Sequence, residues 1–241
     1  PVERYYYDGA GRVYATREET SNPSDPDLDT HYTFDAMGRV TSVKLPDPNT
    51  LGGTSRPTTT YTYYATGAVK TMTDPVGAMT SYDYNELNQL VKVTLPDPDG
   101  ATTTLYSTTK EYVYDAAGRM TSETRSHAGS GAPEFTTSYT YDALDRLKTV
   151  TEPDPDGAGS TYTSPVTTYA YSGPGELYTV TDPEGSVTRY EYDTLHRKTR
   201  EILDNSGVAA KTRYFYDTLG NLSRVQDPML RNVTYEYDAL H

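Results

Sequence analysis

The stretch Tyr112-Val113-Tyr114-Asp115-Ala116-Ala117-Gly118-Arg119-Met120 contains a phrase that the chain repeats ten times. Its template is an aromatic residue, any residue, a second aromatic residue, Asp, two variable residues, Gly, Arg and an apolar residue. A short period that recurs along a whole chain predicts an array of similar structural units, each stabilised by its neighbours. The architecture can therefore be worked out from one phrase.

Each phrase begins with two aromatic residues separated by one position. Residues two apart in a β-strand point to the same face, so each pair places two rings on one side of a strand. Threonine, valine, glutamate and serine surround the rings, which is typical of half-buried strands. The pairs are Tyr5 and Tyr7, Tyr32 and Phe34, Tyr61 and Tyr63, Tyr82 and Tyr84, Tyr112 and Tyr114, Tyr139 and Tyr141, Tyr169 and Tyr171, Tyr190 and Tyr192, Tyr214 and Tyr216, and Tyr235 and Tyr237.

The four residues after each pair predict a tight turn. Asp, Asn or Ser stands first in every copy except the one at Tyr64, and these residues favour the first position of a type I turn. Gly closes six of the turns, and Asn88, Asp145, His196 and His241 close the others. Asn, Asp and His are the non-glycine residues that best tolerate positive φ. We therefore predict a type I turn closed by a left-handed residue, which is a common hairpin loop.

The return strand begins with an apolar residue, and a second apolar residue often follows three places later, as in Val40 and Val43. Lys198 is the exception at the first of these positions. A spacing of three breaks strict alternation and predicts a bulge in the second strand. A helix is the alternative, but Thr, Val and Pro crowd these segments and no helical period is sustained. Asp-Pro pairs then predict a second turn, so each unit is strand, turn, strand, turn.

The composition limits the class of protein. The chain has 241 residues, 25 tyrosines and no cysteine, so disulfides are impossible, and its aromatic content argues against disorder. Its net charge of −13 disfavours nucleic acid as a partner, because phosphates require Lys and Arg. There is no apolar run long enough for a membrane helix and no signal peptide. Since the chain begins at Pro1 and ends at His241 inside a phrase, we expect a piece of a longer protein.

The spacing of the copies predicts the overall architecture. Successive turns are 21 to 30 residues apart, the additions lie at the Asp-Pro turns, and no change of composition marks a domain boundary. Residues 1–241 are therefore predicted to form a single continuous array. Open twisted sheets rarely exceed ~10 strands without curling or splitting. We predict an all-β fold: a spiralling antiparallel strip of about ten β-hairpin repeats that forms a curved shell, tube or β-solenoid, with stacked aromatic rings on one face.

The phrase, with Asp-Pro-x-Gly between its copies, resembles the tyrosine–aspartate (YD) repeat of the RHS family over essentially the whole chain. The resemblance implies a large β-sheet shell and an extracellular or cell-surface location. Such repeats are known from bacterial polymorphic toxins, insecticidal toxin complexes and animal teneurins, where the shell encloses a toxic C-terminal segment or serves in adhesion. Carbohydrate binding has also been associated with the family. The patterned core segment that ends toxin-bearing shells, rich in Arg-Tyr-Tyr-Asp, has no match in this sequence.

Catalytic and metal sites find little support in the sequence. Two of the four histidines, His196 and His241, occupy the left-handed turn position, and motifs for serine nucleophiles, zinc and phosphate are absent. We predict no catalytic residues, no cofactor and no enzyme activity. Carboxylates two apart in loops, at 97 and 99 and at 154 and 156, could offer oxygen ligands to calcium. Turn chemistry explains them better, and no glutamate stands at the distance of a bidentate ligand, so no metal site is predicted.

Six tyrosines lie outside the aromatic pairs, namely Tyr6, Tyr14, Tyr64, Tyr106, Tyr162 and Tyr178. Tyr106 and Tyr162 stand in the long insertions, where binding residues are often found. They are our candidates for carbohydrate binding, and the alternative is that they only pin the loops by packing. A structural role in the repeat is predicted for Tyr112, Tyr114, Asp115, Gly118, Arg119, Tyr139, Tyr141, Asp142, Tyr190, Tyr192 and Asp193.

The sequence favours a non-enzymatic structural segment of an extracellular or cell-surface β-shell, tube or fibre. One alternative is a carbohydrate-binding adhesion module, and another is the wall of a toxin-encapsulating RHS shell. The expected partners are neighbouring repeats of the same chain, with other copies of the chain or surface glycans as further possibilities. Nucleic acid and membrane insertion are not expected.

Overall fold

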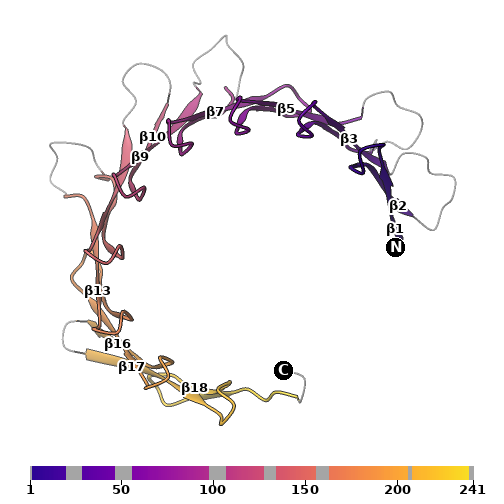
Figure 1. Cartoon of the computed structure of the whole chain (residues 1–241). Coiled ribbons are helices and arrows are strands. Elements are labelled where there is room, and N and C mark those ends of the chain that lie inside the picture. Colours follow the sequence, from indigo (N-terminus) through magenta and orange to yellow (C-terminus); the bar gives the residue numbers. More distant parts are fainter. Residues whose placement is uncertain are drawn as a thin grey trace. The chain divides into compact units, whose positions relative to one another are not determined.

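A computed structural model describes residues 2–19, 29–46, 56–97, 107–127, 134–155, 163–205 and 208–238. Over these residues the chain forms antiparallel strands joined by turns, and all nineteen strands belong to one sheet (Figure 1). The predicted all-β array of hairpins is therefore confirmed. The chain divides into two compact units, one made of residues 1–113 and 124–134 and the other of residues 114–123 and 135–241.

The strands are short and follow the repeat. The first nine are β1 (Val2–Tyr7), β2 (Val13–Glu19), β3 (Asp29–Phe34), β4 (Val40–Lys44), β5 (Thr58–Tyr63), β6 (Val69–Thr73), β7 (Met79–Tyr84), β8 (Leu90–Thr94) and β9 (Thr108–Tyr114). The other ten are β10 (Met120–His127), β11 (Phe135–Tyr141), β12 (Leu147–Thr151), β13 (Val166–Tyr171), β14 (Leu177–Thr181), β15 (Val187–Tyr192), β16 (Lys198–Asn205), β17 (Val208–Tyr216), β18 (Leu222–Gln226) and β19 (Asn232–Thr234).

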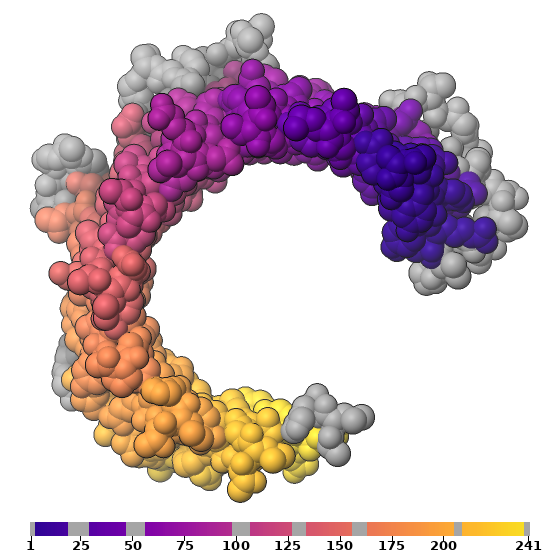
Figure 2. Space-filling model, in the orientation of Figure 1, coloured from indigo at the N-terminus to yellow at the C-terminus, as the bar shows by residue number. Residues whose placement is uncertain are grey.

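Each strand pairs with the strand next to it in the chain, from β1 to β9 and again from β11 to β19. Within each unit this produces a curved row of hairpins that is one sheet thick (Figures 1 and 2). A single layer can bury little. Among the described residues only Ala15, Val93 and Ile202 are buried apolar side chains.

The two faces of the sheet differ in chemistry. Across most hairpins the aromatic pair stands opposite apolar residues of the return strand, as where Tyr139 faces Val150 and Tyr141 faces Leu147. We call this side the tyrosine face. The residue between the two aromatics points to the other side, the threonine face, where hydroxyls pair across the hairpin. Thr140 and Thr149 are one such pair, with 2.6 Å between their Oγ1 atoms. Alternation along the strands therefore separates rings from hydroxyls.

The bulge predicted in the second strand is confirmed. In the hairpin of β11 and β12, Thr140 pairs with Thr149 while Tyr141 pairs with Leu147, so Lys148 is the extra residue. The same shift occurs beside the second aromatic residue in seven other hairpins, those of β1–β2, β3–β4, β5–β6, β7–β8, β13–β14, β15–β16 and β17–β18. The bulge keeps both apolar residues of the return strand on the tyrosine face although they are three positions apart.

The turns also match their prediction. In each of the nine such turns that the structure describes, the fourth residue donates its N–H to the carbonyl of the first, as Gly118 does to Asp115 at 2.9 Å, while His241 lies outside the described residues. The closing residue has positive φ, including the predicted substitutes Asn88 (60°), Asp145 (64°) and His196 (63°). Leu230, which closes an Asp-Pro turn, also has a positive φ of 65°. A γ-branched residue in this region is costly, so the residue type does not predict it.

The aspartate that begins the turn binds both the backbone and the arginine that follows the turn. Asp142 accepts backbone N–H groups of Leu144 (2.9 Å) and Arg146 (3.0 Å) on Oδ1, and the Arg146 Nε on Oδ2 (2.7 Å). One carboxylate thus satisfies the loop backbone and orients the guanidinium group. The same pairing joins Asp8 to Arg12, Asp35 to Arg39, Asp115 to Arg119 and Asp193 to Arg197.

The oriented arginine covers the second aromatic ring of the next hairpin. Arg146 lies over Tyr171 with 4.4 Å from the guanidinium carbon to the ring centroid, within the range of a cation–π contact. The Tyr171 hydroxyl in turn donates to the carbonyl of Leu147 at 2.8 Å. We call the aspartate, the arginine and the covered ring a turn lock. The other four pair Arg12 with Phe34, Arg39 with Tyr63, Arg119 with Tyr141 and Arg197 with Tyr216, at 4.5 to 4.8 Å.

The turn locks correct the expectation of stacked aromatic rings. Successive rings on the tyrosine face are separated by guanidinium groups in five places. The ring-to-ring contacts that the structure shows join Tyr6 to Tyr14 and Tyr64 to Tyr84. A guanidinium group held over a ring makes a directional contact between hairpins, whereas the contact of two apolar rings is less specific.

The residue that closes each turn should be sensitive to replacement by an ordinary side chain. We predict that Asn88→Ala lowers the free energy of unfolding by about 1 kcal/mol, because alanine pays the cost of positive φ, while Asn88→Gly changes it by less than about 0.5 kcal/mol. The control is Glu86→Ala in the same exposed turn, which should be nearly neutral. Urea unfolding followed by circular dichroism measures all three. Equal stability of the alanine and glycine variants at 88 would contradict the prediction.

The turn locks should make the array sensitive to acid. The arginine hydrogen bonds hold the pKa of Asp115, Asp142 and Asp193 below the usual range, and the backbone N–H bonds of Arg12 and Arg39 do the same for Asp8 and Asp35. A carboxylate with a depressed folded-state pKa stabilises the fold above its unfolded pKa of about 3.9, and this stabilisation is lost as pH falls through the folded value. We predict that the melting temperature falls as the pH is lowered from about 5 to about 2.5.

General charge repulsion also changes with pH and has to be separated from this effect. The net charge is −13 at pH 7 and crosses zero near the pI of about 4.7, and below that pH the 21 lysines and arginines and the four histidines give a growing positive charge whose repulsion also opposes folding. Melting curves at a series of pH values, at low and high salt, separate the two effects. A melting temperature that rises or stays level as the pH is lowered would show that the turn locks contribute little.

Candidate functional site

Four of the described turns that follow an aromatic pair lack the arginine, namely those that begin at Tyr64, Asn85, Ser172 and Asp217. At Tyr64 the aromatic residue replaces the aspartate, and its ring meets Tyr84 edge-on, with 5.9 Å between centroids and 83° between planes. At the next turn, Asn85 donates to Gln89 at 2.8 Å in place of the ion pair. In both turns a contact within the chain therefore replaces the ion pair of aspartate and arginine.

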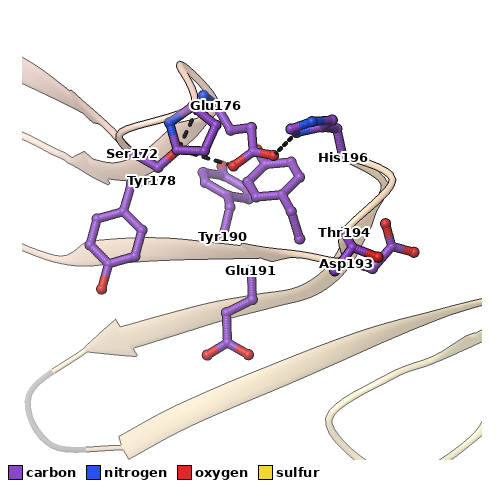
Figure 3. Close-up of a pocket in the computed structure, with 10 residues that line it drawn as sticks. Ser172, Glu176, Tyr178, Tyr190, Glu191, Asp193, Thr194 and His196 are labelled. Carbon is purple, nitrogen blue, oxygen red and sulfur yellow. Dashed lines mark hydrogen bonds and ion pairs between the residues drawn. The ribbon is translucent and has the colours of Figure 1, made fainter.

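The turn between β13 and β14 departs further, because it reverses the charge. Ser172 stands in place of the aspartate and Glu176 in place of the arginine. The Ser172 hydroxyl donates to Oε2 of Glu176 at 3.0 Å, and Oε1 lies 2.5 Å from Nδ1 of His196. The glutamate is thus held between its own turn and the left-handed closing residue of the following turn, as Figure 3 shows.

A cleft of about 480 Å³ opens at this position. Its lining combines residues of two turns with tyrosine rings from β14 and β15. The lining residues are Ser172, Pro174, Glu176, Tyr178, Tyr190, Glu191, Tyr192, Asp193, Thr194 and His196. Tyr192 is the ring that an arginine at 176 would cover, and its hydroxyl keeps the usual bond to the carbonyl of Leu177 at 2.9 Å. Tyr178 is the bulge residue of β14 and is 45% exposed.

The electrostatics of the cleft centre on Glu176. Its side chain is 18% exposed, and the hydrogen bond with His196 holds its pKa below the usual range. Burial raises the pKa of Tyr192, and the negative charge of Glu176 raises it further. The carboxylate is therefore ionised at neutral pH and acts directly on the tyrosine beside it.

The other two carboxylates of the lining are already paired with arginines. Glu191 points to the opposite side of the ribbon from Glu176 (Figure 3), where Arg189 and Arg200 lie 3.2 and 2.9 Å from its oxygens. Asp193 belongs to the turn lock of Arg197. Glu176 is thus the lining carboxylate that bonds to a histidine and a hydroxyl rather than to an arginine.

A polar pair interrupts the tyrosine face next to this cleft. Lys198 and Glu201 take the two positions that are apolar in most return strands, and their side chains meet at 2.8 Å. The ammonium group lies 4.4 Å from the ring centroid of Tyr214 and 5.5 Å from that of Tyr190. Burial lowers the pKa of Lys198, but the hydrogen bonds and negative charges of Glu201 and Tyr214 together outweigh it, and the pKa is raised. The exception at Lys198 thus replaces apolar contact with a cation between two rings.

The cleft does not place its serine beside its histidine, as the nucleophile and base of a Ser–His pair would be. A serine nucleophile needs a base within hydrogen-bond reach. Here Ser172 and His196 both bond to Glu176, which separates the hydroxyl from the imidazole. No cluster of three potential metal ligands is found among the residues that the structure describes. Nor does any helix in that part of the chain have the length and apolar character needed to span a membrane.

The structure places only some of the residues singled out from sequence. Tyr106 and Tyr162 lie outside the described residues, as do positions 99 and 156 of the two carboxylate pairs, so carbohydrate binding there stays a prediction. Asp115, Arg119 and Tyr141 form one turn lock, and Asp142, Arg146 and Tyr171 form the next. Glu176 was missed, although the replacement of Arg by Glu inside the phrase could have marked it.

Comparison with known proteins places this geometry in a family. The family described as Teneurin YD-shell matches residues 3–157, which is more than half of the chain, and the family described as RHS Repeat matches residues 171–209. No curated protein matches the chain.

Solved structures share the fold. The crystal structure of TcdB2-TccC3 without its hypervariable C-terminal region and that of TcdB2-TccC3-Cdc42 each align with a TM-score of 0.68 and 19% identity over 96% of this chain. The chain spans only 12% and 13% of the length of those two chains. The Tc holotoxin pore of Photorhabdus luminescens, carrying a TccC3 mutation, aligns with a TM-score of 0.40 and 13% identity, over 97% of this chain and 15% of that one. From the family match and the repeated turn, the chain belongs to the YD-shell family of RHS-type repeat proteins.

Proposed function

We propose that this chain is a stretch of wall in an RHS-type shell that encloses another polypeptide segment, and that its contribution is structural. The observation that carries the proposal is the link between successive hairpins. Each complete turn lock joins a turn to the aromatic ring of the next hairpin, and where that ring is a tyrosine its hydroxyl returns a bond to the backbone before it. A protein built from such links is a continuous sheet rather than a packed core.

The distribution of hydrogen bonds supports a wall without gaps. Tyrosine hydroxyls donate to the carbonyl that begins the preceding return strand at Val40, Met120, Leu147, Leu177, Lys198 and Leu222, from 2.5 to 3.0 Å. Paired strands fill the rest of each row, so the backbone leaves few open positions between neighbouring hairpins. A sheet with its backbone groups paired in this way is a suitable barrier to another chain.

The solved relatives support enclosure as the purpose of the wall. The TcdB2-TccC3 structure that shares this fold was solved without a hypervariable C-terminal region. Because this chain spans 12–13% of the TcdB2-TccC3 chains, enclosure requires many more hairpins of the same kind in the parent protein. The proposal therefore concerns the parent protein, to which these residues contribute a part of the wall.

The earlier expectations of a cell-surface location and of glycan binding stay predictions. Both came from the family resemblance, and the candidate tyrosines for glycan binding fall outside the described residues. Enclosure is preferred because it uses the features that repeat through the chain, namely the turn locks and the strand ladder.

The test is limited proteolysis of the full-length parent protein with and without one broken link. We predict that the enclosed segment is protected in the wild type and that Tyr171→Ala, which removes both the ring under Arg146 and the hydroxyl bond to Leu147, speeds its cleavage by about tenfold or more. A tenfold rise in the open population corresponds to about 1.4 kcal/mol.

The control is Leu144→Ala, at the tip of the preceding turn, where the side chain is 69% exposed and replacement should leave cleavage unchanged. Mass spectrometry of the fragments identifies which segment is cut. Rapid cleavage of every candidate segment in the wild type, or equal rates in the wild type and the Tyr171 variant, would argue against enclosure.

A further inference from the structure

The complete turn locks show which chemical group normally covers the second aromatic ring of a hairpin. In five places that group is the guanidinium of an arginine, 4.4 to 4.8 Å from the ring centroid. At Tyr192 the chain supplies Glu176 instead, and a cleft of about 480 Å³ adjoins the ring. Glutamate is shorter than arginine, so it cannot place a planar group over the same ring.

The replacement supplies a partner for the missing group. The Glu176 carboxylate turns back to Ser172, at 3.0 Å, much as each arginine turns back to its aspartate. A carboxylate therefore stands beside an aromatic ring at the place where a turn lock would hold a cation. Carboxylate and ring together are the two elements that recognise a guanidinium group, through charge-assisted hydrogen bonds and a cation–π contact.

The carboxylate has capacity left for a ligand. An ionised carboxylate can accept about four hydrogen bonds, and the structure shows two on Glu176, from Ser172 and at His196. His196 is 65% exposed, so it can move aside without disturbing a packed core. The lining contains no lysine or arginine, and the neighbouring Lys198, which lies 5.5 Å from the Tyr190 ring, is paired with Glu201.

A second depression on the tyrosine face shows the contrast. It measures about 390 Å³ and is lined by Tyr5, Arg12, Val13, Thr16, Tyr32, Phe34 and Val40. In it the ring of Phe34 is already covered by Arg12, at 4.6 Å, and Arg12 is paired with Asp8. The cation position there is filled from within the chain.

We propose that the cleft formed by Glu176, Tyr192, Tyr190 and Tyr178 binds a guanidinium group supplied from outside this array, in the position that an arginine of the chain occupies in the complete turn locks. The ligand class is an arginine side chain presented by a polypeptide, or a small guanidinium compound of the same chemistry. The inference stands apart from enclosure, because it concerns one cleft of the wall and holds whether or not the parent protein forms a closed shell.

The test is an NMR titration of the 241-residue chain with N-acetyl-L-arginine amide. The blocked arginine should shift the backbone signals of Glu176, Tyr192 and His196, while N-acetyl-L-citrulline amide, which has nearly the same shape but no charge, should not. Free L-arginine forms the second arm. Similar affinity for both arginines indicates that a small guanidinium compound suffices, and stronger binding of the blocked form indicates a polypeptide arginine.

Variants connect the binding to the residue that was exchanged. Glu176→Gln should weaken binding by about tenfold, because the acceptor loses its charge. The double variant Ser172→Asp with Glu176→Arg rebuilds a complete turn lock and should abolish binding while keeping the fold, checked by circular dichroism. The matched control is Glu184→Gln, an exposed glutamate in the next Asp-Pro turn, which should bind like the wild type.

Any one of four outcomes would overturn the proposal. The first three are no shift of the cleft signals with either arginine, equal shifts with arginine and citrulline, and unchanged affinity in the Glu176→Gln variant. Loss of binding in the Glu184→Gln control would also overturn it, because the response would then reflect net charge rather than the cleft.

Discussion

The contact between a guanidinium group and the aromatic ring of the next hairpin is the interaction on which this structure depends. A sheet one layer thick cannot rely on a core, and Ala15, Val93 and Ile202 are the buried apolar side chains in the described residues. Stability must therefore come from each hairpin's contacts with its neighbours. The arginine provides that contact in both directions, because Arg146 is fixed by Asp142 in its own turn and covers Tyr171 in the next hairpin.

This double role explains which departures the chain accepts. Where the aspartate is replaced at Tyr64, the substitute brings a ring of its own to Tyr84, so the neighbour is still covered. On β16, Lys198 replaces an apolar residue but places its ammonium group between two tyrosine rings and against Glu201. Each change keeps a contact between hairpins even though its chemistry differs. The constraint acts on the link between units and leaves the residue types within a unit free to vary.

The sequence predicted what is local and missed what depends on the distance between hairpins. Turns and bulges follow from the conformational preferences of a few adjacent residues, so Asn88, Asp145 and His196 could be placed at positive φ from residue type alone. The contact of Arg119 with an aromatic ring could not be assigned in that way. The ring that it covers belongs to Tyr141 in the next hairpin, and only the spacing of the strands brings the two residues together. The same gap produced the incorrect expectation of stacked rings. Leu230 was missed because its positive φ opposes its residue type.

Because the same link recurs along the array, a single hairpin can lose it without unfolding the sheet. In an array whose units contribute nearly additively, the loss of one link among many lowers stability by the energy of that link and leaves the remaining hairpins paired. The turn at Ser172 illustrates the consequence: the Tyr192 hydroxyl still bonds to Leu177, and Glu176 is bonded on both sides, so the wall continues although the arginine is missing. A charge reversal at this position opens a cleft without opening the sheet. A repeat protein can therefore acquire a binding site at a single turn while the neighbouring turns go on holding the wall together.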